Sequence, residues 1–189
     1  VVFALAMPTI ASIGMEIEGE NYEFEIDAGW AAVAPTVDGE IDEDEYANAT
    51  VIDMEYYSNS TTNRNDTIYI YFMNDNDWLY IAVDVLPDNT STEGDFCYIA
   101  FDEDNNDEWE PDLPDFEAWY GVETVNYSGE LIIVSDSLKP LLYAGGQTTT
   151  MNDDEEDHAV WEFAIPLSAF IYGELETGDT VGIAMIGGG

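Results

Sequence analysis

The densest group of residues that could do chemistry is the acidic stretch FDEDNNDEWEPDLPD, residues 101–115, which follows a run of apolar residues. Calcium takes roughly six to eight oxygen ligands from carboxylates, amide carbonyls and backbone. A loop that is anchored on the end of a strand can supply such a set, so we predict a calcium site here. The expected ligands are Asp102, Asp104, Asn106, Glu108 and Asp112.

The start of this stretch has the ligand spacing of an EF-hand loop, but the match does not continue. Asp107 stands where an EF-hand has its sixth-position glycine, and Leu113 stands where it has its twelfth-position glutamate. The predicted site is therefore not an EF-hand. A solvated acidic turn without a bound ion is the alternative interpretation.

Two further acidic clusters, residues 38–45 and 152–158, are either cation ligands or solvated surface. His158 is the only histidine, which excludes zinc centres built on several histidines. Cys97 is the only cysteine and lies in an apolar run, so we expect a buried structural thiol and no intrachain disulfide. A reactive pair of Cys97 and His158 would require that thiol to be exposed.

Enzymatic chemistry finds little support in the residue types. Paired carboxylates can hydrolyse glycosides, but among 42 acidic residues such pairs arise by chance. The chain has no glycine-rich phosphate loop and no nucleophile elbow, and Arg64 and Lys139 are its only cationic side chains apart from the histidine. We therefore expect a protein that binds or assembles and is not an enzyme. Two aromatic residues in or after the acidic stretch, Trp109 and Trp119, could stack on sugar rings.

The formal net charge of −40 restricts the partners. Binding to nucleic acid or to an anionic membrane surface requires clusters of Lys and Arg, so both are excluded. The chain contains 46% hydrophobic and 13% aromatic residues, which distinguishes it from acidic disordered chains. We expect one folded domain whose carboxylate repulsion is offset by salt, by divalent cations or by both.

Apolar alternation predicts short strands along the chain, and no long amphipathic helix is evident. Asn, Asp and Gly turns separate the strands, which favours an all-β fold, specifically a β-sandwich of the jelly-roll type. The expected strands are residues 22–26, 67–73, 78–85, 96–101, 131–134, 160–165 and 180–186, with a hairpin at residues 74–77.

The first 20 residues form an apolar extension ahead of the sandwich domain, which we assign to residues 21–189. Large apolar side chains occupy one parity of this extension, as in a strand, and Pro8 favours an edge or added strand. The segment is too short and too interrupted for a membrane span. A signal-peptide remnant and a short pilin-like helix are the alternatives.

Asn-x-Ser/Thr sequons in segments with loop composition indicate an extracellular protein that carries covalent glycans. The five acceptor residues are Asn48, Asn59, Asn65, Asn89 and Asn126.

The order of several segments resembles the family-nine carbohydrate-binding modules and the related DOMON-like sandwiches. The resemblance implies a calcium-bearing β-sandwich in which Asp102 and Asp104 lie in an acidic loop after a strand, and it implies sugar binding through aromatic residues. The apolar extension departs from this pattern, as does the end of the chain at Gly189, where such modules continue into another strand. The matching segments are APTVDGEIDEDEYANAT, NDWLYIAVDVLPD, DFCYIAFDEDNND, AVWEFAIPLSAF and GDTVGIAMI.

A sandwich that lacks a strand offers unpaired backbone groups to a strand from another molecule. We therefore expect a structural subunit of an extracellular filament or surface layer of archaeal type, a homopolymer joined by donated N-terminal strands and stabilised by calcium. Each large apolar side chain buried at the junction would contribute ~1.5–3 kcal/mol. The alternative function is a secreted carbohydrate-binding module, and the alternative structure is a strand that pairs within its own sheet. The assembly residues are Val1, Phe3, Leu5, Met7 and Ile13.

Overall fold

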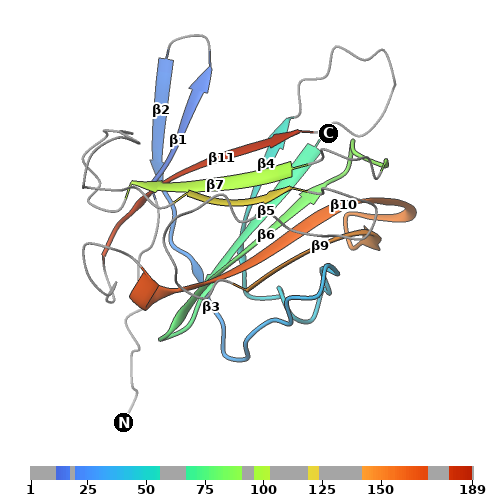
Figure 1. The fold of residues 1–189 in the computed structure, drawn as a ribbon, viewed down its shortest axis with the longest axis horizontal. Coiled ribbons are helices and arrows are strands. Elements are labelled where there is room, and N and C mark those ends of the chain that lie inside the picture. Colours follow the sequence, from blue (N-terminus) through green and yellow to red (C-terminus); the bar gives the residue numbers. More distant parts are fainter. Residues whose placement is uncertain are drawn as a thin grey trace.

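In the computed structural model most of the described residues lie in β-strands, and the one helical element among them is a 3₁₀ turn at Leu167–Ala169 (Figure 1). This confirms the prediction of an all-β fold. The described part contains no helix with the length and hydropathy that a membrane span needs. The described residues are 12–17, 20–55, 67–90, 96–102, 119–123, 142–169 and 179–188.

The first sheet, sheet A, has the strand order β2-β1-β11-β7-β8. Strands β11 and β7 are antiparallel, whereas β1 pairs with β11 in parallel. The first and last described strands of the chain are therefore neighbours in this sheet. The strands of sheet A are β1 (Ser12–Ile17), β2 (Glu20–Glu25), β7 (Phe96–Asp102), β8 (Trp119–Glu123) and β11 (Gly182–Gly188).

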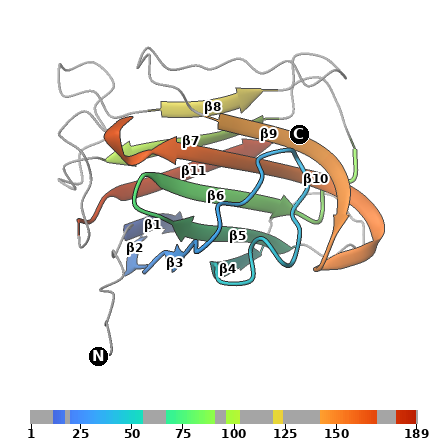
Figure 2. The same cartoon turned by 90° about the horizontal axis from the view of Figure 1, so that it is seen from below.

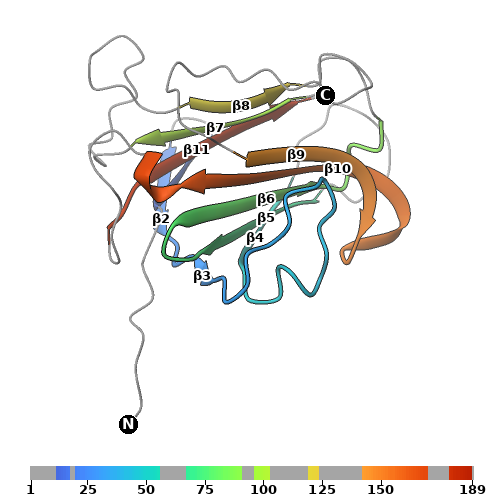
Figure 3. The same cartoon turned by 60° about the horizontal axis from the view of Figure 1, so that its bottom comes forward.

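The second sheet, sheet B, has the order β3-β5-β6-β10-β9, with β4 also paired to β5. Figure 3 shows it as a layer on one side of β7, β8 and β11. Its strands are β3 (Gly29–Trp30), β4 (Thr50–Glu55), β5 (Thr67–Asn74), β6 (Trp78–Val85), β9 (Leu142–Thr150) and β10 (Asp153–Pro166).

The hairpin between β5 and β6 follows the prediction, with its turn at residues 74–77. Asp75 explains the turn locally, because its Oδ1 accepts hydrogen bonds from the backbone N–H groups of Asp77 and Trp78, both at 2.8 Å. An Asp side chain that bonds the backbone two or three residues ahead is a standard turn device.

One buried cluster draws its side chains from both sheets. In β6 and β10 it takes alternate residues, such as Ile81 and Phe163, which is the period of a strand with one face on a core. Sheet A contributes Ile99 and Ile183 to the same cluster. The two sheets therefore contribute to one core, while the β-sandwich of the jelly-roll type stays a prediction.

The opposite face of sheet B, here called the outer face, is covered by the chain segment 31–49, which crosses it in Figure 2. Tyr46 of this segment is buried against Tyr71 of β5, with ring centroids 5.6 Å apart. The segment comes close to β9 at Gly146, where an added Cβ atom would clash with the carbonyl oxygen of Gly39. Glycine is therefore needed where the segment meets β9.

Strands expected at residues 22–26, 67–73, 78–85, 96–101, 160–165 and 180–186 all occur; the bounds of β6 match the expectation, and at least one end of each other strand differs. The predicted strand at residues 131–134 lies outside the described residues, and the division of the chain at residue 20 stays a prediction. The sequence reading omitted β3, β4, β8 and β9. In β9 the reason is composition, because LYAGGQTTT has no apolar alternation.

Candidate functional site

The candidate assembly site is the edge of β11 that faces β1. On its other side, β11 pairs with β7 over its whole length, from Gly182 opposite Asp102 to Gly188 opposite Phe96. Towards β1 the pairing is limited to Ser12 opposite Gly182 and Ile13 opposite Ile183. In Figure 1, β1 and β2 diverge from β11 after this crossing. Among the described residues, no strand pairs with residues 184–188 on this side.

Burial of the β11 side chains changes where β1 diverges. Ile183, which pairs with Ile13, is fully buried, whereas Met185 is only partly buried although it packs against the same core cluster. Ile52, Met54 and Ile68 of sheet B are likewise partly buried and packed against that cluster. The shared core therefore has incompletely buried side chains at Met185 in sheet A and at these three positions in sheet B.

The residues predicted for assembly fall partly outside the description. Ile13 lies in β1, which pairs with β2 and β11 of the same chain, the arrangement that we gave as the alternative for this segment. The other four, Val1, Phe3, Leu5 and Met7, are outside the described residues, so strand exchange between molecules stays a prediction.

The predicted calcium loop begins beside the assembly site. Asp102 ends β7 and lies opposite Gly182, which itself lies opposite Ser12 of β1 on the other side. Among the described residues, no group of three or more His, Cys, Asp or Glu side chains is arranged to hold a metal ion. The remaining predicted ligands, Asp104, Asn106, Glu108 and Asp112, lie outside the described residues.

The other predicted sites are placed in part. Asn48 is exposed in the segment that covers sheet B, and Asn89 is half-buried after β6. Trp119 opens β8, the strand at one edge of sheet A. The sequons at Asn59, Asn65 and Asn126 and the aromatic residue Trp109 lie outside the described residues.

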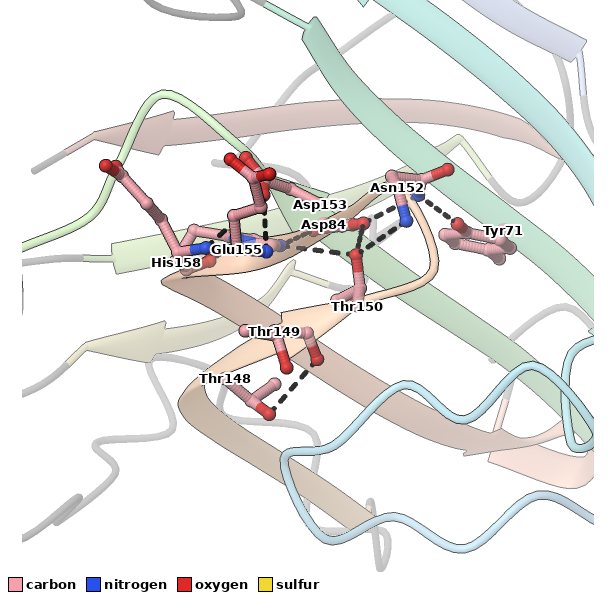
Figure 4. A network of polar contacts seen from close by, with 10 residues as sticks. Tyr71, Asp84, Thr148, Thr149, Thr150, Asn152, Asp153, Glu155 and His158 are labelled. Carbon is pink, nitrogen blue, oxygen red and sulfur yellow. Dashed lines mark hydrogen bonds and ion pairs between the residues drawn. The ribbon is translucent and has the colours of Figure 1, made fainter.

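A second constellation, which the sequence reading did not assemble, is a buried polar network on the outer face of sheet B (Figure 4). His158 of β10 and Asp84 of β6 are 1% and 0% exposed, and the His158 Nε2 atom lies 2.6 Å from Asp84 Oδ1. Asp84 Oδ2 accepts hydrogen bonds from Thr150 Oγ1 and Asn152 Nδ2, each at 2.7 Å. Asn152 Nδ2 also lies 2.5 Å from the hydroxyl oxygen of Tyr71.

The geometry assigns the protons in this network. The His158 Nδ1 atom lies 2.9 Å from the carbonyl oxygen of Glu156, which can only accept, so Nδ1 carries a proton. Nε2 faces a carboxylate oxygen, so it carries a proton as well, and the pair is an imidazolium–carboxylate ion pair. Burial lowers the pKa of His158, but the hydrogen bonds to Asp84 and to the Glu156 carbonyl outweigh this effect and raise it above 6.5.

This arrangement differs from a nucleophile with its general base. Thr150 Oγ1 lies 3.3 Å from His158 Nε2, but the hydroxyl proton is donated to Asp84 and Nε2 has no free lone pair. A general base must accept the proton of the nucleophile. Cys97 is buried in the shared core, where burial raises the pKa of its thiol to about 12. The network therefore anchors the β9–β10 hairpin to the sheet.

A second buried acid on the outer face is Glu162 of β10, which fastens the covering segment. Glu162 Oε2 accepts hydrogen bonds from the backbone N–H groups of Asp38 and Gly39, at 3.0 and 2.7 Å, and Oε1 accepts one from the Tyr46 hydroxyl at 2.8 Å. Burial raises the pKa of Glu162, although these three hydrogen bonds oppose the shift. The acidic segment 38–45 is thus held by a carboxylate that accepts its backbone donors.

Comparison of the chain with protein-family models and with curated proteins finds no match. The resemblance to family-nine carbohydrate-binding modules and DOMON-like domains therefore stays an expectation from the sequence.

Proposed function

We propose that this chain is a structural subunit of an extracellular filament or surface layer, in which the N-terminal strand of one copy completes the sheet of the next. The observation that carries the proposal is the one-sided pairing of β11, which leaves five residues, 184–188, without a described partner towards β1. A strand edge of this kind is a template for strand addition. The apolar alternation before Ser12 supplies a strand of the same chemistry.

Calcium has a specific place in this proposal. The acidic stretch starts at Asp102, in register with Gly182 and Ser12, so a cation bound there would act next to the point where β1 joins sheet A. A divalent cation also offsets repulsion between subunits of charge −40. Glycans on exposed sequons such as Asn48 agree with an extracellular location.

The test compares the full chain with a variant that lacks residues 1–11, both examined by negative-stain electron microscopy and by analytical ultracentrifugation. We expect concentration-dependent elongation of the full chain and monomers for the variant. Monomers in both samples would contradict the proposal. The alternative function, a carbohydrate-binding module, predicts instead a monomer whose migration is retarded in a gel containing polysaccharide.

The role of calcium is tested by thermal unfolding with calcium and with a chelator in excess. Because a ligand that binds only the folded state stabilises it, we expect a lower unfolding midpoint in the chelator. Magnesium at the same ionic strength is the control for general charge screening. Equal midpoints in calcium, magnesium and chelator would remove the specific calcium site from the proposal.

A further inference from the structure

Residues 184–188 of β11, which have no described partner towards β1, lie away from the chain that precedes Ser12, because of the direction in which β1 runs. Because β1 and β11 are parallel, the chain enters β1 beside Gly182, at the end of β11 opposite Gly188. The part of this edge that has no partner among the described residues, here called the open edge, begins after Ile183 and runs towards Gly188. To pair there, the residues before Ser12 of the same molecule would have to reverse direction past β1. A strand from another molecule has no such constraint.

The chemistry of the open edge selects an apolar occupant. Its sequence, Ala184 to Gly188, is AMIGG and contains no charge. Met185 packs against the shared core but stays partly exposed, as do Ile52 and Met54 from the facing sheet. A strand added along residues 184–188 would place alternate side chains against this part of the core. Large apolar residues at every second position are therefore the best fit.

The charge of the chain indicates which segment of a second copy can pair with this edge. In a protein of net charge −40, most segments of a second copy would bring carboxylates to the edge, whereas residues 1–15 contain no charged side chain. Within them, Phe3, Leu5 and Met7 give three large apolar side chains of one parity before Pro8. Small alanines, Ala4 and Ala6, occupy the other parity.

We propose that the edge of β11 from Ala184 to Gly188 is the acceptor for residues 1–7 of a second copy of this chain. In the joined sheet, Phe3, Leu5 and Met7 of the donor lie on the face that carries Met185, and Ala4 and Ala6 lie on the face of Ala184. This acceptor rests on the proposed function and deepens it, because it assigns the contact to one strand and one face.

The test is disulfide formation between copies. Residues opposite each other on neighbouring strands are close enough for a disulfide, so Ala4→Cys and Ala6→Cys are each mixed with Ala184→Cys, the two partners carrying different affinity tags. After mild oxidation we expect a dimer that contains both tags in at least one mixture. The unsubstituted chain should form none, because Cys97 is buried and its thiol pKa is raised to about 12.

The matched control replaces Ala184→Cys by Trp119→Cys on β8, at the other edge of sheet A, because Ala184 and Trp119 both lie opposite Ala100 and so share one face of the sheet. We expect the mixed dimer to be lost in this control. A mixed dimer with Trp119→Cys but not with Ala184→Cys would overturn the acceptor, as would the absence of any mixed dimer. A double variant, Ala4→Cys with Ala184→Cys, that closes its disulfide within one monomer would also overturn it.

Electron microscopy of the same samples separates the two proposals. Filaments that form without any cross-link to the Ala184→Cys variant would reject this acceptor and leave the filament function standing. Absence of filaments in the unsubstituted chain would reject the proposed function itself.

A second measure compares Met185→Asp with Met151→Asp, because Met185 packs on the core and Met151 is an exposed residue between β9 and β10. Loss of elongation only in Met185→Asp is the expected result. Equal elongation of both variants would oppose the acceptor.

Discussion

Both faces of sheet B bury side chains, but they differ in chemistry. The inner face contributes apolar residues to the shared core, such as Ile81, Phe163 and Ile165, and a buried Asn74 lies at the end of β5 in register with Leu79. The outer face combines apolar residues with buried ionisable groups, above all Asp84, His158 and Glu162, each no more than 1% exposed. The inner face packs one regular sheet on another, whereas the outer face must fix an irregular segment and a hairpin in one position.

The difference shows what buried acids do in a chain with 42 acidic residues. A buried carboxylate is costly unless its oxygens find donors. Both oxygens of Glu162 and both oxygens of Asp84 have close polar partners, and most of these belong to the segment or the hairpin being held. We expect the largely apolar inner face to provide most of the stability and the outer face to fix the positions of the segment and the hairpin.

Phe163→Ala, on the inner face, should have the largest effect on stability. Phe163 is fully buried in the shared core, and truncating a buried phenylalanine costs about 3–5 kcal/mol through lost transfer free energy and the cavity left behind. Urea unfolding measures the change, with Val33→Ala as the control because Val33 is 81% exposed. If Phe163→Ala lost less unfolding free energy than the outer-face variants, the inner face would not be the main source of stability.

His158→Gln should cost about 3 kcal/mol, the lower end of the range for removing one partner of a buried ion pair. Thr150 and Asn152 still donate to Asp84 in this variant, which limits the loss. Hydrogen exchange of the β9–β10 hairpin should also become faster. The control is Asp157→Asn at the neighbouring exposed position, and a variant as stable as this control would show that the pair contributes nothing.

Glu162→Gln should cost about 1–3 kcal/mol, because an amide cannot accept from all three donors and leaves at least one buried donor unsatisfied. Protection of the segment 31–49 against proteolysis should fall more than protection of the hairpin. Glu155→Gln on an exposed part of β10 is the matched control. Unchanged proteolysis of the segment would mean that apolar packing alone holds it.

The smallest expected effect is a pH dependence from His158. Its folded-state pKa is raised above 6.5, mainly by Asp84 and the Glu156 carbonyl against the opposing effect of burial. Its contribution to stability is therefore fully present below pH 6.5 and is lost as pH rises through the folded-state pKa. Asp153 also faces the ring electrostatically and favours the charged form. Unfolding free energies measured from about pH 6 to 9 should decline in the natural chain.

His158→Gln provides the control for this prediction, because the decline should flatten in that variant. Glu162 also makes the unfolding free energy decline as pH rises, but at lower pH. Burial raises the pKa of its carboxyl, so the folded state binds the proton more tightly than the unfolded state does. Its window begins near the ordinary glutamate value of about 4.3, well below that of histidine. If the unfolding free energy of His158→Gln declines above pH 6.5 as steeply as that of the natural chain, other groups cause the decline.

The sequence predicted the parts of the fold that follow from local alternation. TIYIYFM and WLYIAVDV have strand periodicity, and the Asn and Asp residues between them indicated the turn that Asp75 closes. β4 has the same signal, because Ile52 and Met54 pack on the core and Val51 and Asp53 are exposed, so this strand was within reach of the sequence. The β9 strand could not be found locally, because its apolar support comes from Trp161 and the covering segment.

The polar network was beyond a sequence reading because its members come from distant positions. Asp84 and His158 meet only when β6 and β10 pair, next to the register irregularity in β10 between Asp153 and His158. A usable signal did exist. Asp84 in WLYIAVDV and Glu162 in VWEFAI are single acids inside apolar runs, and an acid in such a run must find donors from elsewhere in the fold.

The parallel pairing of β1 with β11 also bears on how the molecule folds. Ser12 and Gly182 are 170 positions apart (182 − 12), and contacts of such long sequence separation form slowly because a large loop must close first. During synthesis β7 has no neighbour on this side until the last described strand has emerged. In sheet B the longest of the β6–β10 pairings spans 88 positions (166 − 78), about half that separation, so kinetic traps and chaperone contacts should concentrate on unfinished sheet A.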